Sequence, residues 1–275
     1  MYAIAGVVES NLSVLRHSPS NRCFESLSTA RAPLLRLFCF PYAGGNAYAF
    51  REWQQHLAPE IDVCLGHLPG RARRIGERHT QMQSLVAELV NAIRTEIHGR
   101  FAFFGHSMGA LVSFELVREL RRRNYSTPLH LFLSACRAPT VMKAVPPTFN
   151  LPTQEFLAEL QKLKGTPQEF FQCPEIQNSL LPLLRADFEV TDTYNYIAES
   201  PLSCPITVYG GEHDNLAPVK NLAPWEFQTS AQYQIRLFSG DHFFIQSHKS
   251  EFLRTLRHDL LQTLCVPRSP TEFTS

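Results

Sequence analysis

The pentapeptide GHSMG (105–109), inside the longer stretch RFAFFGHSMGALVSFELV (100–117), decides the fold expected of this chain. An apolar run precedes it and an amphipathic run follows, so a buried strand is predicted to turn sharply into a helix. Small residues must flank a serine in so tight a turn, and Gly105 and Gly109 meet that requirement. We therefore predict that Ser107 is an exposed nucleophile at a helix N-terminus rather than a bystander in a glycine turn.

Strand-like and helix-like runs alternate along the chain from residue 34 onward. The strand-like runs are apolar at nearly every position, which is typical of strands buried on both faces. Apolar residues recur at helical spacing in 80–97 and 110–124. This alternation predicts an α/β fold with a mainly parallel sheet flanked by helices. The expected strands are 34–40, 61–66, 101–105, 129–135, 206–210 and 233–239.

The chain of 275 residues is expected to form one domain, spanning 34–265. An N-terminal extension (1–33), polar after its first eight positions, is expected to be poorly ordered, and 266–275 form a tail. No strand is expected within about 145–197, where 153–163 and 174–197 have helical patterns. We interpret this insertion as a lid, the alternative being extra helical packing around the core.

Composition excludes several classes of protein. A formal net charge of +1 offers no electrostatic field for nucleic acid. The seven cysteines include no C-x-x-C pair, so we expect neither a disulfide framework nor a zinc site, and no cofactor. No apolar run approaches the roughly 18 residues of a membrane span. These features favour a cytoplasmic protein, expected to be a monomer.

A serine nucleophile requires a histidine base and a carboxylate that orients the base. In chains with this elbow the partners follow in the order serine, acid, histidine. Asp214 lies in GEHDNLAP (211–218), directly after an expected strand, and His242 lies in SGDHFF (239–244), after the last one. The sequence therefore predicts a triad of Ser107, Asp214 and His242.

Other acids and bases fit these positions less well. The segment after the preceding strand (134–147) contains no carboxylate. Glu212 is too close to the end of its strand, and Asp241, beside the histidine, should point elsewhere. His248 is expected on the surface at the start of the last helix.

An oxyanion site needs two backbone N–H donors, one after the nucleophile and one from the loop after an early strand. Met108 supplies the first. In FPYAGGNA (40–47) the glycines let the backbone turn near the site, and Ala43 is the predicted second donor. The alternative is a glycine turn that merely ends the strand.

Seven segments in a fixed order carry a resemblance that covers about residues 34–262. They are LFCFPYAGGNA (37–47), HLPGRARRIGE (67–77), FFGHSMGA (103–110), GTPQEF (165–170), LLRADFEVTDTY (183–194), YGGEHD (209–214) and SGDHFF (239–244). Together they resemble the type II thioesterases, stand-alone α/β-hydrolases that accompany polyketide and nonribosomal peptide synthetases. This family is related to the medium-chain thioesterase of fatty-acid synthase.

The resemblance implies an α/β-hydrolase fold and hydrolysis of acyl thioesters held on the phosphopantetheine arm of an acyl or peptidyl carrier protein. It implies that Ser107, Asp214 and His242 are the triad, and that Met108 and Ala43 line the oxyanion hole. It also implies that the helical insertion gates a hydrophobic acyl channel. The N-terminal extension is longer than the family pattern. Two alternatives stay open, a small-molecule esterase or lipase-like hydrolase and a non-catalytic binding module.

Three further groups of residues have a functional and a plain interpretation. GRARR (70–74) could meet a phosphate or an acidic carrier helix, or form a solvated, internally paired loop. The arginines at 121–123 fit a solvated helix end better than a binding patch. Two methionines and three phenylalanines could line an acyl channel or belong to the ordinary core. They are Met82, Met108, Phe156, Phe170 and Phe171.

Overall fold

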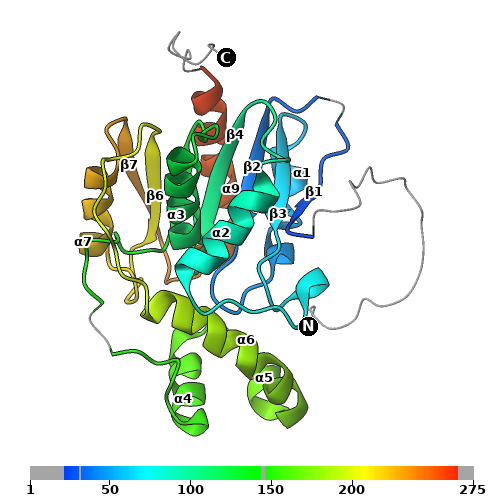
Figure 1. Cartoon of the computed structure of the whole chain (residues 1–275), viewed down its shortest axis with the longest axis vertical. Coiled ribbons are helices and arrows are strands. Elements are labelled where there is room, and N and C mark those ends of the chain that lie inside the picture. Colours follow the sequence, from blue (N-terminus) through cyan, green and yellow to red (C-terminus); the bar gives the residue numbers. More distant parts are fainter. Residues whose placement is uncertain (1–21, 31, 144–145, 266–275) are drawn as a thin grey trace.

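A seven-stranded sheet forms the centre of the molecule in a computed structural model that describes residues 22–30, 32–143 and 146–265 (Figure 1). The strand order is β1-β3-β2-β4-β5-β6-β7, and every neighbouring pair is parallel except β1 with β3. The strands are β1 (Phe24–Ser26), β2 (Leu35–Phe40), β3 (Ile61–Gly66), β4 (Phe101–His106), β5 (Leu131–Ser134), β6 (Ile206–Gly211) and β7 (Tyr233–Phe238).

Helices cover both faces of this sheet (Figure 1). On one face α2 (Met82–Ile93) and α3 (Met108–Arg122) share a core with the 3-10 helix η3 (Ala223–Gln228). On the other face α1 (Trp53–Leu57) packs with α9 (Lys249–Cys265). The remaining short helices outside the insertion are η1 (Ala47–Phe50), η2 (Ala72–Arg74), α7 (Val219–Leu222) and α8 (Phe244–Ser247).

Alternate residues of the central strands enter opposite cores. In β2, Leu37 and Cys39 pack under α1 and α9, whereas Phe38 and Phe40 pack under α2 and α3. Since both faces are covered, every residue of β3, β4, β5 and β6 is buried. This double burial explains why the sequence of these strands is apolar without alternation.

Three helices between β5 and β6 form the helical insertion, which lies beyond one end of the sheet (Figure 1). They are α4 (Thr153–Leu163), α5 (Gln168–Gln172) and α6 (Pro174–Asp192). The insertion has an apolar core of its own around Phe156, Phe170 and Leu184. Pro182 lies inside α6 and lacks the N–H that a regular helix would bond four residues back.

The α/β class, the mainly parallel sheet and the helical insertion expected from the sequence are confirmed. Two details differ. The helix expected at 174–197 ends at Asp192, and an unpredicted strand, β1, lies within the expected extension. A strand of three residues is too short for its sequence pattern to be recognised. Its extended conformation depends on the antiparallel pairing with β3. Residues 1–21 of the expected extension and the expected tail, 266–275, lie outside the described residues.

None of the helices in the described ranges has the length and apolar character of a membrane-spanning segment.

We expect the substitution Phe38→Ala to lower the free energy of unfolding by about 3–5 kcal/mol, the usual loss for a fully buried phenylalanine. Phe38 is fully buried and meets the rings of Phe24, Phe101 and Phe103 edge-on. Urea unfolding measures the change. Phe227, 72% exposed, is the control, and Phe227→Ala should change the free energy by less than about 0.5 kcal/mol. Equal losses for the two variants would contradict this assignment of the core.

Candidate active site

The elbow at Ser107 joins β4 directly to α3. Ser107 has φ 55° and ψ −115°, a conformation that costs a residue with a side chain free energy and is found at functional sites. Its N–H donates to the carbonyl of Ser134 on the neighbouring strand β5 at 2.8 Å. A side chain at Gly109 would collide with the backbone of Phe40 and Pro41, and one at Gly105 with the backbone of Gly109. The two glycines are therefore required by close backbone approach, as the sequence predicts.

Asp214 and His242 lie in contact on the loops after β6 and β7. His242 Nδ1 is 2.8 Å from Asp214 Oδ2, and both residues are buried. The other carboxylate oxygen, Oδ1, accepts from the N–H groups of Leu216 and Ala217 at 2.8 and 3.0 Å. With Nδ1–H donated to the carboxylate, the imidazole has Nε2 as its proton acceptor.

The carboxyl group of Asp214 is held in its ionised form. Burial would raise its pKa, but the hydrogen bond and charge of His242, together with the two backbone N–H donors, lower the pKa below its ordinary value. An ionised carboxylate fixes the tautomer of the imidazole and stabilises an imidazolium beside it.

Backbone hydrogen bonds tie the two loops together. The N–H of Glu212 donates to the carbonyl of Phe238 at 2.9 Å, and that of His213 to the carbonyl of Gly240 at 2.9 Å. The carboxylate of the neighbour Asp241 has other partners: its Oδ1 accepts from the N–H of Phe243 at 3.0 Å, and its Oδ2 lies 3.9 Å from Lys164 Nζ. The acid and the base are therefore brought together by main-chain contacts that do not depend on their own side chains.

The histidine lies beside the elbow. The rings of His242 and His106 are 5.3 Å apart, and His106 directly precedes Ser107. His106 is fully buried, and its Nδ1 lies 2.9 Å from Ser134 Oγ. Burial, together with the charge of His242, lowers the pKa of His106 well below its ordinary value, so this imidazole stays neutral. The elbow residue Ser107 and the Asp214–His242 pair thus converge at the carboxyl ends of β4, β6 and β7.

In the loop after β2, two backbone N–H groups donate hydrogen bonds within the protein, and that of Ala43 has no acceptor among the described residues. The N–H of Gly45 donates to the carbonyl of Tyr42 at 2.8 Å, which closes a four-residue turn. The N–H of Gly44 donates to Asp187 Oδ2 at 2.7 Å. Among the described residues, none accepts a hydrogen bond from the N–H of Ala43. Met108, as the first residue of α3, likewise has an N–H without an intrahelical partner.

Asp187 is a buried acid at this site that the sequence reasoning did not single out. It lies on α6, and its Oδ2 accepts from both the Gly44 N–H and the Arg71 guanidinium. Burial raises the pKa of the Asp187 carboxyl group, and Arg71 and the Gly44 amide oppose that rise. The available signal was an acid between apolar residues in LLRAD (183–187), where a solvated side chain would not be expected.

The arginine clusters have mainly structural contacts. Arg71 pairs with Asp187, and Arg74, 1% exposed, pairs with Glu77 and Glu88. These contacts favour the internally paired interpretation of GRARR for both residues. At the end of α3, the arginines at 121–123 contact carboxylates and a side-chain amide within the chain, from Glu199, Glu119 and Asn91.

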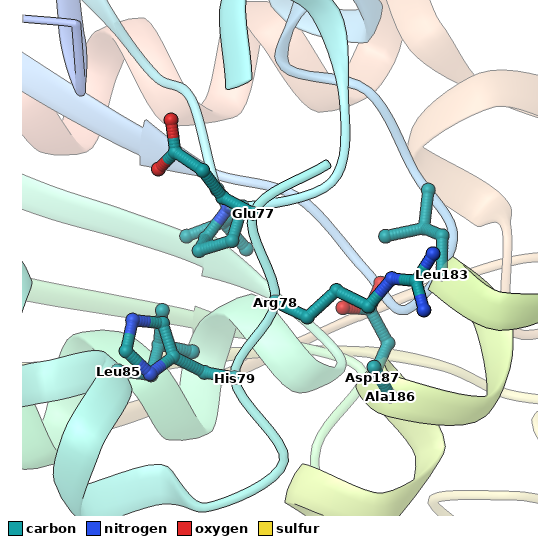
Figure 2. A pocket seen from close by; sticks show the side chains of 9 residues that line it. Glu77, Arg78, His79, Leu85, Leu183, Ala186 and Asp187 are labelled. Carbon is teal, nitrogen blue, oxygen red and sulfur yellow. The ribbon is translucent and has the colours of Figure 1, made fainter. Parts of the chain in front are cut away.

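A small pocket lies between the loop that follows β3 and helix α6 (Figure 2). Figure 2 shows the side chain of Arg78 extending from the loop toward Asp187 and Leu183 on α6. The free volume of this pocket is about 10 Å³, which is space for one water molecule at most. It is therefore too small to hold an acyl chain.

The phenylalanines of the insertion belong to its core. Phe156 and Phe170 are 0% and 2% exposed and pack with Leu160 and Leu184. These contacts favour the ordinary-core interpretation over an acyl channel. A hollow of about 360 Å³ lies among the insertion helices, and three of its six lining residues are glutamines; the lining is Gln154, Leu157, Ala158, Gln161, Phe171 and Gln177. Among the described residues, no group of three histidine, cysteine or acidic side chains is placed to hold a metal ion.

Comparison with known proteins identifies relatives of this fold and site. Residues 35–260 match the thioesterase domain family. The gramicidin S biosynthesis protein GrsT of Aneurinibacillus migulanus is 42% identical over 86% of this chain and 93% of its own length. The human medium-chain S-acyl fatty acid synthase thioesterase is 33% identical over 79% of this chain and 83% of its own. The solved structure of YbtT, a type II thioesterase from the yersiniabactin NRPS/PKS pathway, is 31% identical, with a TM-score of 0.77, covering 86% of this chain and 97% of YbtT.

We expect Asp214→Asn to slow phosphonylation of Ser107 by a fluorophosphonate by roughly 10³–10⁴-fold, the scale on which a triad acid acts. The amide would donate to Nδ1 and stabilise the wrong imidazole tautomer. Labelling rates followed by intact-protein mass spectrometry measure the effect. Asp241→Asn is the matched control, because Asp241 precedes the histidine but its carboxylate contacts the Phe243 N–H and Lys164. Comparable slowing in both variants would remove Asp214 from the proposed role.

Proposed function

The chain belongs to the thioesterase family, and from this premise we propose that it hydrolyses acyl thioesters carried on the phosphopantetheine arm of acyl or peptidyl carrier proteins. The resemblance drawn from the sequence motifs is confirmed at the level of the family, and the enzyme is a thioester hydrolase. The observation that carries the proposed mechanism is the 2.8 Å contact between His242 Nδ1 and Asp214 Oδ2 beside the serine elbow.

In the proposed acylation step, Ser107 Oγ attacks the thioester carbonyl carbon while His242 Nε2 accepts the hydroxyl proton. The Asp214 carboxylate stabilises the imidazolium that forms. Negative charge develops on the carbonyl oxygen, and the N–H groups of Met108 and Ala43 donate to it. Collapse of this intermediate breaks the carbon–sulfur bond, and the thiolate takes up the proton from His242.

In the proposed deacylation step, His242 accepts a proton from water, which attacks the acyl-serine carbonyl carbon. The same two N–H groups stabilise the second tetrahedral intermediate. Its collapse releases the carboxylic acid and returns the proton to Ser107 Oγ. One imidazole therefore serves as base and acid in both halves of the reaction.

The carrier proteins and the setting are part of the proposal. GrsT is named for gramicidin S biosynthesis and YbtT for an NRPS/PKS pathway. The resemblance to type II thioesterases implies that the substrates are thioesters held on carrier proteins. The chain would act as a monomer in the cytoplasm, where its seven free cysteines stay reduced. The single domain would span 34–265, and its segment at about 145–197 would act as the lid over the acyl group.

A small-molecule esterase is the second candidate, because the same arrangement of side chains hydrolyses oxygen esters. A non-catalytic binding module is a third, but an intact acid–base pair beside a strained serine elbow is hard to account for without catalysis.

We expect Ser107→Ala to lower kcat for a carrier-bound acyl thioester by roughly 10⁴–10⁶-fold, the scale for loss of a triad nucleophile. Liquid chromatography with mass detection of the free acid measures turnover. Ser113→Ala is the control, since Ser113 lies on α3 and its hydroxyl only donates to the Gly109 carbonyl. A Ser107→Ala protein that retained most of the parent activity would refute the serine mechanism.

We also expect an acyl-pantetheine thioester to be hydrolysed faster than the matched oxygen ester, and the carrier-bound thioester faster still. Binding energy from the carrier and arm would be used to orient the carbonyl over Ser107. A panel of acyl carrier proteins, acyl-pantetheines and oxygen esters, compared by kcat/KM, tests this order. A preference for the free oxygen ester would favour the esterase candidate instead.

A further inference from the structure

We propose that Asp187 is a positioning residue of the oxyanion hole: from helix α6 it anchors the turn after β2 so that the Ala43 N–H points at the reacting carbonyl. This inference rests on the proposed function, because it takes Ala43 as an oxyanion donor. Asp187 itself touches neither substrate nor reacting atoms. Its effect passes through the Gly44 peptide group.

The turn at Tyr42–Gly45 is held at two points. The Gly45 N–H to Tyr42 carbonyl bond, 2.8 Å, closes the turn, and the Gly44 N–H to Asp187 Oδ2 bond, 2.7 Å, holds its central peptide group. Gly44 has φ 73°, so this peptide group is rotated into an orientation that favours glycine. Ala43 lies between the two anchored groups, and the direction of its N–H is set by them. Without the Asp187 acceptor, the central peptide group loses the partner that selects this orientation.

The hydrogen-bond acceptor, the Asp187 carboxylate, is held in place by its ion pair with Arg71. The guanidinium of Arg71 bonds Asp187 Oδ2 and donates through Nη1 to the Pro69 carbonyl at 2.6 Å. Arg71 and Asp187 are only 5% and 6% exposed, so water competes little for the carboxylate. A hydrogen bond from an amide to an ionised acceptor is stronger than one to a neutral acceptor. The ion pair therefore favours one orientation of the Gly44 peptide group.

Apolar contacts set the position of the acceptor relative to the turn. A side chain at Gly44 would collide with Leu184, and one at Gly70 with Leu183. These two leucines precede Asp187 on α6. Leu184 contacts the loop after β2 at Gly44, and Leu183 contacts the loop after β3 at Gly70. Figure 2 shows Leu183 and Asp187 on the part of α6 that faces the loop after β3. The helix is thus fitted against the backbone of the turn, with no room for an intervening side chain.

The expected effect is on the chemical step. Removing one oxyanion donor lowers kcat by roughly 10²–10³-fold. Misdirecting the Ala43 N–H should have a smaller effect, and we expect Asp187→Ala to lower kcat by roughly 10–100-fold, with KM changed by less than about threefold. Asp187→Asn keeps an oxygen that can accept from Gly44 and should recover most of the lost rate.

Asp187→Ala alone leaves Arg71 as an unpaired buried charge, which strongly destabilises proteins. The double variant Arg71→Met/Asp187→Ala removes both charges and also lacks the acceptor, so it should fold and show the same loss of kcat. Asp192→Ala is the matched control. The side chain of Asp192, also on α6, is buried and pairs with Lys143, but its backbone donors are Thr148 and Phe149, which are not part of the turn after β2.

The measurement is kcat per active site on an acyl-pantetheine thioester, with sites counted by complete fluorophosphonate labelling of Ser107. A purely structural role would reduce the number of sites and leave kcat per site unchanged. Binding of an acyl trifluoromethyl ketone, whose adduct carries an oxyanion, should weaken by the same factor as kcat/KM. The expected pattern is a loss in both Ala variants, recovery in Asp187→Asn and no loss in Asp192→Ala.

A double variant within about threefold of the parent kcat would overturn the role of Asp187 while leaving the proposed function intact. A loss of equal size in Asp192→Ala would also overturn it, because the effect would then follow from disturbing α6. A parent protein that neither hydrolyses thioesters nor labels at Ser107 would refute the proposed function itself, and this inference with it.

Discussion

The backbone conformation of Ser107 is the constraint on which the rest of the site depends. A residue with φ 55° between a strand and a helix requires β4 and α3 to meet at a sharp angle, with Gly109 against the backbone of Phe40 and Pro41. β4 pairs with β2 on one side and with β5 on the other, so the strand before the turn is held in place. The Ser107 N–H donates to the carbonyl of Ser134 on β5. The backbone conformation of Ser107 costs free energy, and the packing of a sheet that helices cover on both faces offsets this cost.

Each remaining part of the site uses the same edge of the sheet but a different kind of interaction. The acid and base loops are tied by main-chain hydrogen bonds after β6 and β7. The turn after β2 is held by a hydrogen bond from the Gly44 N–H to a buried carboxylate of α6, that of Asp187. The two buried carboxylates have different partners: Asp214 contacts the imidazole of His242, and Asp187 accepts from the Gly44 N–H and from Arg71. The loops at this edge of the sheet are therefore held in place partly by their own main-chain hydrogen bonds and partly by contacts with the insertion.

The sequence was sufficient where a residue's role depends on local geometry or chain order. The glycines around Ser107 and the carboxylate after β6 follow from turn sterics and from the position of each strand end. It was insufficient for Asp187, whose partner Gly44 is 143 residues away and whose role depends on how α6 packs. β1 was missed for the same reason, since three residues become a strand only through their pairing with β3. Contacts distant in sequence leave no periodic signal in one chain.

In the proposed enzyme, helix α6 has two functions: it is part of the lid, and it contacts the loops that form the site. Pro182 interrupts its hydrogen-bond ladder directly before Leu183, Leu184 and Asp187, the residues that contact the loops of the hydrolase core. Residues on both sides of Pro182 also pack in the apolar core of the insertion, Ile176 and Leu181 before it and Leu184 and Phe188 after it. A helix weakened at that point can bend there while its second half stays fixed by the ion pair to Arg71. In the proposed mechanism, a bend at Pro182 would therefore leave the contact between Asp187 and the Gly44 N–H in place.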